Sequence, residues 1–420
     1  MNQVKQLFLE AFKASLENRI VDWTEEISAA EWTEFFQLAD KHRVLPMIYG
    51  AVYAAPSFQN CSAVFRRRQR TWALRQTVRQ TEKTLAFKNL YTYLRENGCI
   101  PVVVKGLICR SLYPNPDMRL SNDEDLFIPE ERCPEFHRAF LQYGMQIAEN
   151  RQYDPNASET AYSQENSPLY IELHKHLFAP EVRAYGNLNR YFDNAFGDAL
   201  MEAEIDGQTY LTMEPTTHLF YLLCHAFKHF LHSGFGLRQV SDCALYANAY
   251  GAEIDWEWLL ERCCEIRADL FAASVFAIGE KYLTFDPEQA HFPDRWRSIR
   301  VDETPMLEDL LDAGIYGQEK MRRHSSNITL QAVAADRRGQ YVSGKTAEGI
   351  LASICLPRQT MEKDYVYLRK HPYLLPAAWV QRVLRYRSEI NKKEKRRIST
   401  ESIRLGSERV ELMRTYGIIK

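Results

Sequence analysis

The sequence lacks the features that mark several large classes of protein. No apolar run approaches the roughly 20 residues that a helix needs to cross a bilayer, so we expect no membrane partner. The nine cysteines include no C-x-x-C pair, which argues against a zinc ribbon or a disulfide framework. An excess of one charge is also missing, because 53 basic and 55 acidic side chains give a formal net charge of −2. Composition therefore predicts no global attraction to nucleic acid or membrane.

Apolar residues, by contrast, are plentiful. Of the 420 residues, 45% are hydrophobic and 12% aromatic, which is ample material for a large core. At about 100–200 residues per domain, this length predicts two to four domains. The first twenty residues are amphipathic with interspersed charges, unlike a secretory signal. Together with the scattered cysteines, this start predicts a reduced, cytoplasmic protein.

Hydrophobic periodicity divides the chain into four segments. Apolar residues recur at helical spacing up to residue 96, and the helical period returns from residue 214 onward. Between them, short β-branched runs alternate with helical patterns and turn residues, which predicts a small mixed sheet. We expect an α+β fold with four regions: N-terminal helices 1–96, an α/β core 97–213, a helical domain 214–300 that closes a cleft, and a C-terminal helical region 301–420 with a basic tail.

The core contains several expected strands and turns. The run at 100–104 reads as a buried strand that ends at the turn Lys105-Gly106, with a short helix and a loop behind it. The polar, turn-rich segment 154–167 reads as a loop. Further strand signals lie at 123–128, 146–153 and 169–173, and a hairpin edge at 207–211.

Carboxylates interrupt two of these strands. Side chains alternate faces along a strand, so Asp123 and Asp125 point to one side and Glu124 to the other. Carboxylates so placed favour a hard cation such as Mg²⁺, with Mn²⁺ as the alternative. Two such ions can clamp an in-line nucleotidyl displacement. Glu172 is an acid in an otherwise apolar strand and shares a face with His174. The alternative is that these acids merely flank a strand edge.

Histidines form a stripe on the helix expected to be capped by Thr216 or Thr217. Their offsets of seven, four and three place them on one side of that helix. No H-E-x-x-H motif completes a zinc site. Either the histidines are packed and hydrogen-bonded, or two of them line a catalytic cleft, with Asp242 orienting one. The four histidines are His218, His225, His229 and His232, of which His225 and His229 are the cleft candidates.

Basic residues cluster in two stretches, Arg66–Arg79 and Arg382–Arg397. A solvated helix face explains such clusters in most proteins. The alternative is a phosphate-rich partner such as RNA, which would contact the clustered side chains through its backbone.

The order of these motifs resembles the uncharacterised bacterial nucleotidyltransferase-like family, a branch of the DNA polymerase beta-type superfamily. The turn, the acidic strand, the later E-L-H strand and the H-x-x-x-H helix occur in the family's order. The residues that carry the resemblance are Lys105-Gly106, Leu112-Tyr113-Pro114, Arg119, Ser121, Asp123, Asp125-Leu126, Glu172-Leu173-His174, His225, His229 and Asp242.

The resemblance implies a nucleotidyltransferase core that moves a nucleoside monophosphate from an NTP, ATP by default, to an unidentified acceptor. Asp123, Asp125 and Glu172 would hold Mg²⁺, and Glu172 could instead serve as a base. Superfamily members carry Gly-Ser in the turn before the acidic strand, where this chain has Lys-Gly. The residues that the resemblance then leaves for phosphate binding are Lys105, Gly106, Arg119 and Ser121.

Two rival functions stay open. One is a non-catalytic protein that binds nucleotides or a partner on the same fold. The other is a toxin-like RNA-modifying transferase, which the basic stretches favour and the net charge of −2 disfavours. Under the leading hypothesis, replacing Asp123 and Asp125 by asparagine should leave the metal-free fold at least as stable, because like carboxylates repel each other.

Overall fold

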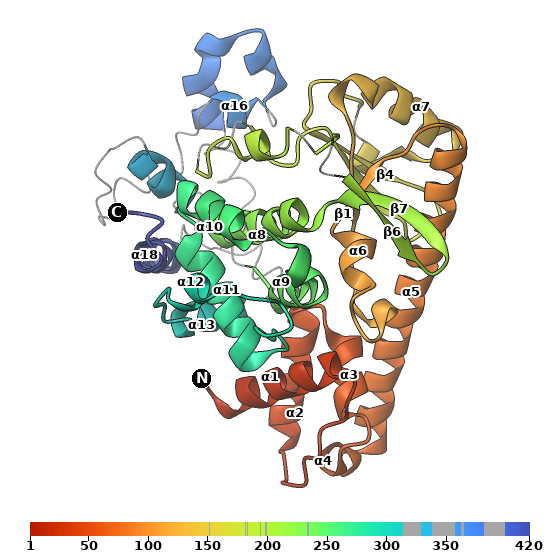
Figure 1. Cartoon of the computed structure of the whole chain (residues 1–420), viewed down its shortest axis with the longest axis vertical. Helices are drawn as coiled ribbons and strands as arrows, with labels where there is room; N and C mark the ends of the chain where they lie inside the picture. The colour runs from red at the N-terminus through yellow and green to blue at the C-terminus, as the bar shows by residue number, and fades with distance from the viewer. Residues whose placement is uncertain are drawn as a thin grey trace.

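The computed structural model describes most of the chain (Figure 1). The described residues are 1–150, 152–180, 182, 184–193, 195–197, 200–232, 235–313, 329–337, 358–362, 365–381 and 400–420. The basic stretch Arg382–Arg397 lies outside them. The architecture is α+β, as expected: a small mixed sheet lies between an N-terminal group of helices and a larger helical half. The four region boundaries drawn from the sequence stay a prediction.

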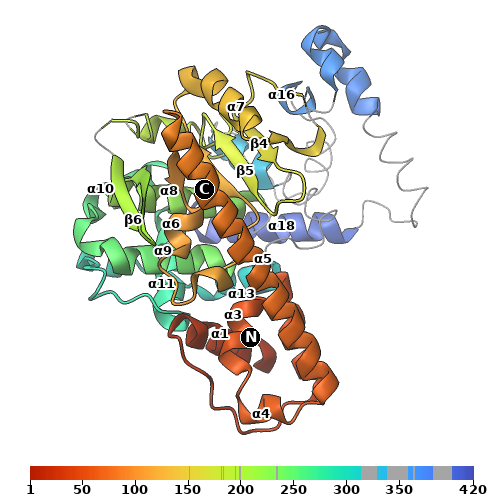
Figure 2. The same ribbon diagram turned by 90° about the vertical axis from the view of Figure 1, so that its right-hand side faces the viewer.

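The N-terminal helices form an aromatic core against one long helix. A capping box starts the second of them, with Ser28 and Glu31 bonding each other's backbone N–H groups. The long helix α5 extends from this core to the level of the sheet (Figures 1 and 2). The helices are α1 (Gln3–Leu16), α2 (Ala29–Lys41), α3 (Leu45–Val52), α4 (Pro56–Gln59) and α5 (Ala63–Glu96).

The central sheet has five strands in the order β1-β2-β5-β4-β3. Only the pairing of β2 with β5 is parallel among these described strands. Helix α6 (Gly106–Arg110) follows β1, and helix α7 (Cys133–Gln142) follows β2. The strands are β1 (Val102–Val104), β2 (Glu124–Phe127), β3 (Gln146–Ile147), β4 (Glu159–Ser163) and β5 (Tyr170–His174).

The expected loop 154–167 is wrong in its central part, because β4 lies there. Polar residues surround Tyr162 in the sequence and hide the strand signal. In the structure Tyr162 is buried and stacks on Phe140 of α7, with ring centroids 4.6 Å apart. The expected hairpin edge is a complete hairpin of β6 (Leu200–Ile205) and β7 (Gln208–Met213). Its Asp206-Gly207 turn has positive φ at both residues, which is the usual requirement of a two-residue hairpin loop.

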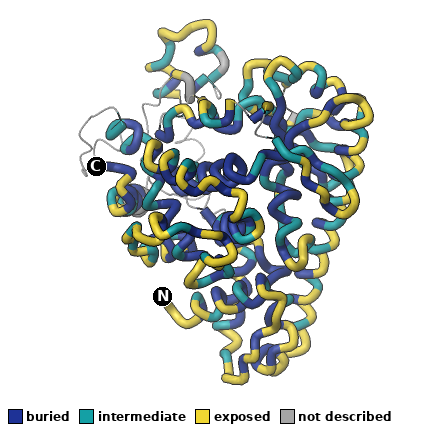
Figure 3. Tube along the Cα trace, viewed as in Figure 1, coloured by how far each residue is buried: buried dark blue, intermediate teal, exposed yellow. Residues whose placement is uncertain are grey.

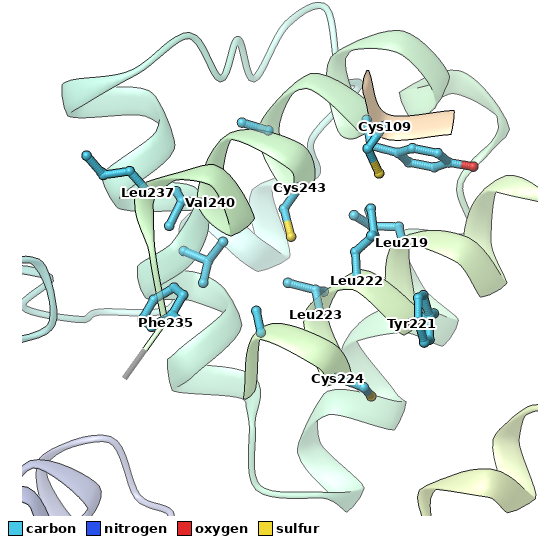
Figure 4. Packing of buried hydrophobic residues seen from close by; sticks show 14 of the residues in the cluster. Cys109, Leu219, Tyr221, Leu222, Leu223, Cys224, Phe235, Leu237, Val240 and Cys243 are labelled. Atoms are coloured by element: carbon cyan, nitrogen blue, oxygen red, sulfur yellow. The ribbon is translucent and has the colours of Figure 1, made fainter. Parts of the chain in front are cut away.

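The helical half is built around α8, most of which is buried (Figure 3). Figure 4 shows Leu222 and Leu223 of α8 facing Cys243 of α9. Glu214 caps α8 in place of the expected threonines, since its carboxylate accepts the N–H groups of Thr216 and Thr217 at 2.8 and 2.6 Å. The helices are α8 (Pro215–His232), α9 (Leu237–Tyr250), α10 (Trp256–Glu265), α11 (Asp269–Tyr282), α12 (Asp294–Arg297), α13 (Thr304–Ala313), α16 (Arg358–Met361) and α18 (Thr400–Thr415).

A close approach of β2 to the turn after β1 predicts the effect of two glycine substitutions. Gly106 has φ of +29°, and a Cβ there would lie 2.2 Å from Oε2 of the buried Glu124. Gly98 also has positive φ, but nothing lies within 4 Å of its Cβ position. Gly98→Ala should cost roughly 1–2 kcal/mol of unfolding free energy. Gly106→Ala should cost about 3 kcal/mol or more, because it also disturbs a buried ion pair. Urea unfolding measures both, and equal costs would contradict this account.

Candidate active site

The parallel pairing of β2 with β5 brings two of the predicted acids together. Asp125 lies directly opposite Glu172 in the register, and Phe127 lies opposite His174. Because residues two apart on a strand share a face, His174 lies beside Glu172. One ligand atom from each of Asp125, Glu172 and His174 lies within 4.8 Å of the other two. Glu124 faces the opposite side, as the alternation predicts.

Asp123 lies just before β2 and is half-buried. It lines the same cavity as Asp125 and Glu172, so all three predicted acids border one space. The tightest group of potential ligands among the described residues nevertheless contains His174 where the sequence suggested Asp123. The reason is geometric: Asp123 precedes the paired part of the strand, whereas His174 lies within it.

The cavity lies between the sheet and the helical half, with a volume of about 340 Å³. The strands contribute its acids, and α8 and α9 contribute most of its basic and amide side chains. The expected face of His225 and His229 therefore borders the same space as the acids. The lining residues of α8 are Tyr221, His225, Lys228 and His229, and those of α9 include Arg238, Gln239 and Asp242.

Two cations neutralise Asp125 in the structure. Its Oδ2 lies 2.7 Å from Lys105 Nζ, and its Oδ1 lies 3.2 Å from His174 Nε2. Burial alone would raise the pKa of Asp125, but Lys105 and His174 lower it below its usual range. Burial opposes the charged form of His174, yet its hydrogen bonds to Asp125 and Glu172 raise its pKa to about 9. The acidic side of the cavity thus carries its own counter-ions.

The histidine stripe on α8 divides between two roles. His218 is buried, and its Nε2 accepts the backbone N–H of Lys105 at 3.1 Å. His225 Nε2 lies 3.3 Å from Lys105 Nζ and 3.3 Å from His229 Nε2. Burial and the nearby Lys105 hold the pKa of His225 well below its ordinary value. A neutral His225 therefore accepts a hydrogen bond from Lys105, so one histidine positions its backbone and another its ammonium group.

All four residues expected to bind phosphate contact protein groups in the structure, Lys105 through Asp125 and His225. Gly106 packs on Glu124. Arg119 forms a two-point ion pair with Asp242, whose Oδ1 also accepts from Tyr113 at 2.8 Å. This corrects the expectation for Asp242, which orients Arg119 and Tyr113 where a histidine was expected. This arrangement depends on long-range contacts between the segment that connects α6 to β2 and helix α9, so local spacing could not reveal it.

Ser121 belongs to a buried charge cluster behind the acidic strand. Its hydroxyl lies 3.0 Å from Glu124 Oε1 and 3.1 Å from Arg110 Nη1. Arg110 and Glu124 are both fully buried and form an ion pair at 3.0 Å. Lys83 of α5 lies 3.9 Å from the same carboxylate. Burial lowers the pKa of Lys83 to about 8, although Glu124 opposes this shift.

The profile of a family described as uncharacterised nucleotidyltransferases matches residues 28–284. The chain belongs to this nucleotidyltransferase family. The match covers well over half of the chain and includes the whole sheet, the cavity and helices α8 and α9. No curated protein and no solved structure matches the chain. Within the described part of the chain, no helix combines the length and apolar character required to cross a membrane.

The donor chemistry of the nucleotidyltransferase cavity fits a hard cation. Asp123, Asp125 and Glu172 offer carboxylate oxygens to one space, which are the ligands that Mg²⁺ prefers. His174 offers a nitrogen, which suits Mn²⁺ or Zn²⁺ better. Its Nε2 is already directed at the carboxylates, 3.2 Å from Asp125 and 3.6 Å from Glu172. In this arrangement His174 acts as a hydrogen-bonding partner of the acids.

Sequence reasoning missed several members of the nucleotidyltransferase cavity. Tyr221 lies four residues before His225, so the helical stripe itself could have identified it. Lys228 and Glu159 also line the cavity, but no local pattern distinguishes them from surface charges. The buried pair of Arg110 and Glu124 depends on the packing of α6 against β2, which leaves no signal in the sequence.

These contacts change the expected effect of replacing the two aspartates. Asp125→Asn removes the counter-charge of Lys105 and His174 and should lower the unfolding free energy by about 3–5 kcal/mol at pH 7. Asp123→Asn affects a half-buried side chain and should change it by less than about 0.5 kcal/mol. Urea unfolding of both variants tests this difference, and a neutral Asp125→Asn would contradict the pairing.

The same comparison has a defined pH dependence. Because the folded protein lowers the pKa of Asp125 below its ordinary 3.8, the stabilisation is complete above that pH and is lost as the pH falls through the folded value. The stability difference between the wild type and Asp125→Asn should therefore shrink by up to about 1.4 kcal/mol per pH unit below 3.8. Unfolding at pH 7, 5 and 3 measures this, and a difference that persists unchanged at pH 3 would refute it.

Proposed function

We propose that this protein transfers a nucleoside monophosphate from an NTP, with ATP as the default donor, to the hydroxyl or phosphate of an acceptor, and that it uses Mg²⁺. One observation carries the proposal: Asp125 pairs in register with Glu172 inside a cavity that Asp123 also lines. Lys105 and His174 compensate Asp125, but that ion pairing does not require Asp123 to border the same space, since like charges oppose one another. Membership in a nucleotidyltransferase family supports the same reaction class.

In the proposed reaction, an acceptor oxygen attacks the α-phosphorus, the bond to the bridging oxygen breaks, and pyrophosphate leaves. Mg²⁺ would be held by Asp123 and Asp125 and would supply positive charge to the attacking and leaving oxygens, and the base role of Glu172 would replace its role as a third ligand. The side chain of Asp125 is 4% exposed and that of Glu172 is 29% exposed. Glu172 is therefore the carboxylate that an acceptor hydroxyl can reach, and we assign to it the proton that this hydroxyl loses.

Two lysines that line the cavity, Lys105 and Lys228, are the candidates for binding the phosphates. Lys105 is held between Asp125 and His225, so its ammonium group already points into the cavity. With a cation held by Asp125, Lys105 would no longer be needed as its counter-ion and could interact with the leaving phosphates as a point charge. Lys228 lines the same wall one turn of α8 further on. Of the four residues first expected to bind phosphate, Lys105 is thus the one that the proposal retains.

Label position in the nucleotide tests the reaction class. Wild-type protein with Mg²⁺ and a cell extract should transfer label from α-³²P-ATP, but not from γ-³²P-ATP, to an acceptor. Asp123→Asn should reduce this transfer by at least about a hundredfold, since losing one preorganised group at developing charge costs about 2.7–4 kcal/mol. The control is Glu288→Gln, which removes an exposed acid paired with Arg297 and should be fully active. Transfer of γ-label would identify a phosphotransferase instead.

Thermal unfolding tests binding without turnover. A ligand present at 100 times its dissociation constant stabilises the folded state by about 2.7 kcal/mol. Mg²⁺ with ATP should therefore raise the Tm of the wild type, and Asp123→Asn should abolish this rise while leaving the Tm of the free protein unchanged. If the wild type shows the rise but transfers no label with any NTP or extract, the protein binds nucleotides without catalysis. A rise that survives in Asp123→Asn would remove this aspartate from the metal site.

A further inference from the structure

Helix α5 carries a concentration of positive charge that the protein itself does not neutralise. Residues 63–81 contain six arginines and no acidic residue. Arg67, Arg70, Arg75 and Arg79 are exposed, and no carboxylate among the described residues lies within ion-pair distance of them. Several exposed arginines elsewhere in the described chain do have a carboxylate partner, as Arg190 has Glu265. Other examples are Arg95, Arg295, Arg297 and Arg358.

The unpaired arginines border two hollows along α5. The first, of about 660 Å³, has Arg66, Arg67 and Arg70 on one side and the rings of Tyr49 and Tyr53 on the other. These two rings lie 6.1 Å apart. A recessed site with cations beside aromatic rings suits a flexible polyanion whose bases can stack, which is the arrangement used by proteins that bind single-stranded nucleic acid.

The second hollow leads from α5 toward the catalytic cavity. It has a volume of about 560 Å³ and lies between α5 and the loop 166–168, and its charged lining consists of Arg75, Arg79 and one acid, Glu82. This loop runs into β5, which carries Glu172. Directly after Arg79, Gln80 Oε1 accepts the backbone N–H of Ser121 at 2.8 Å, and Ser121 lines the catalytic cavity. The basic surface of α5 is therefore connected to the proposed active site through Gln80 and Ser121.

We infer that α5 binds single-stranded RNA and directs its terminal hydroxyl into the catalytic cavity as the nucleotidyl acceptor. This deepens the proposed function and rests on it for the transfer step. From Arg67 to Arg79 the helix advances about 18 Å at 1.5 Å per residue. At about 3.4 Å per nucleotide of a stacked strand, this length accommodates about five nucleotides. Exposed single strands with free ends in cells are mainly RNA, which favours RNA over DNA.

The shape of this surface argues against an anionic membrane as the partner. A helix that lies on a membrane presents a continuous apolar face with cations at its margins. On α5, the exposed Leu74 and Val78 are 51% and 55% exposed, but they border the hollows together with the arginines. A recessed, mixed surface of this kind fits a chain that enters it, whereas a flat lipid surface would contact only its rim.

Fluorescence anisotropy with a labelled 12-nucleotide single-stranded RNA of mixed sequence tests the binding step. Wild-type protein should bind with an affinity that falls steeply as salt rises. A variant that replaces four exposed arginines by glutamine should lose at least about tenfold in affinity at 100 mM salt. Each lost phosphate contact should reduce the slope of log affinity against log salt by about 0.7, so the loss of four contacts should reduce it by about 3. The four substitutions are Arg67→Gln, Arg70→Gln, Arg75→Gln and Arg79→Gln.

A matched control separates the effect of α5 from net charge. It replaces four paired arginines and so lowers the net charge by the same amount as the α5 variant. The loss of these surface ion pairs should cost little stability. This control should bind RNA like the wild type. Absence of wild-type binding at 50 mM salt, or equal losses in the two variants, would overturn the proposal. The control substitutions are Arg190→Gln, Arg262→Gln, Arg295→Gln and Arg297→Gln.

Three further measurements identify the partner and isolate the transfer step. Tighter binding of the same DNA sequence, or binding to phosphatidylserine vesicles but not to RNA, would overturn the assignment of RNA. Asp123→Asn should bind RNA normally but transfer no label to it, because this residue acts only in catalysis. If the wild type binds RNA but transfers α-label only to another acceptor, RNA is not the acceptor. If it transfers none at all, the proposed function fails instead.

Discussion

The parallel pairing of β2 with β5 is the constraint on which the candidate site depends. It places Asp125 opposite Glu172. It also places His174 Nε2 3.2 Å from the carboxylate of Asp125 and 3.6 Å from that of Glu172. A slip of the register by one residue would turn every side chain of β5 to the other face. Buried apolar residues on both strands, such as Leu126 and Ile171, oppose such a slip. The packing of these apolar side chains therefore fixes the register, and the register fixes the positions of Asp125, Glu172 and His174.

Charge balance is the second requirement, and the protein meets it separately on the two faces of β2. On the cavity side, Lys105 and His174 compensate Asp125. On the far side, Arg110 compensates Glu124, and Lys83 lies close to the same carboxylate. Uncompensated buried charges would be strongly destabilising, whereas paired ones are tolerated. The four-residue strand thus carries two adjacent acids because each has its own cation.

The sequence correctly predicted the elements that are marked by a pattern in neighbouring residues. The alternation of acids and apolar residues identified β2 and β5, and the helical period identified α8 and its cavity-facing histidines. It failed for β4, because Tyr162 is the only large apolar side chain in that strand, and for the cap of α8, because Glu214 is an uncommon capping residue. Contacts over long sequence separations, such as Arg119 with Asp242, have no local signature.

Lys105 connects the two halves of the molecule through its backbone as well as through its side chain. It has φ of 62°, an uncommon conformation for a residue with a side chain, and its N–H is held by His218 of α8. The end of β1 is therefore fastened to the helical half at the floor of the cavity. The sheet and α8 cannot separate there without breaking this bond, so the floor forms a fixed joint. We therefore expect a ligand of the cavity to bind without separating β1 from α8, so any widening of the cavity has to come from elements farther from this bond.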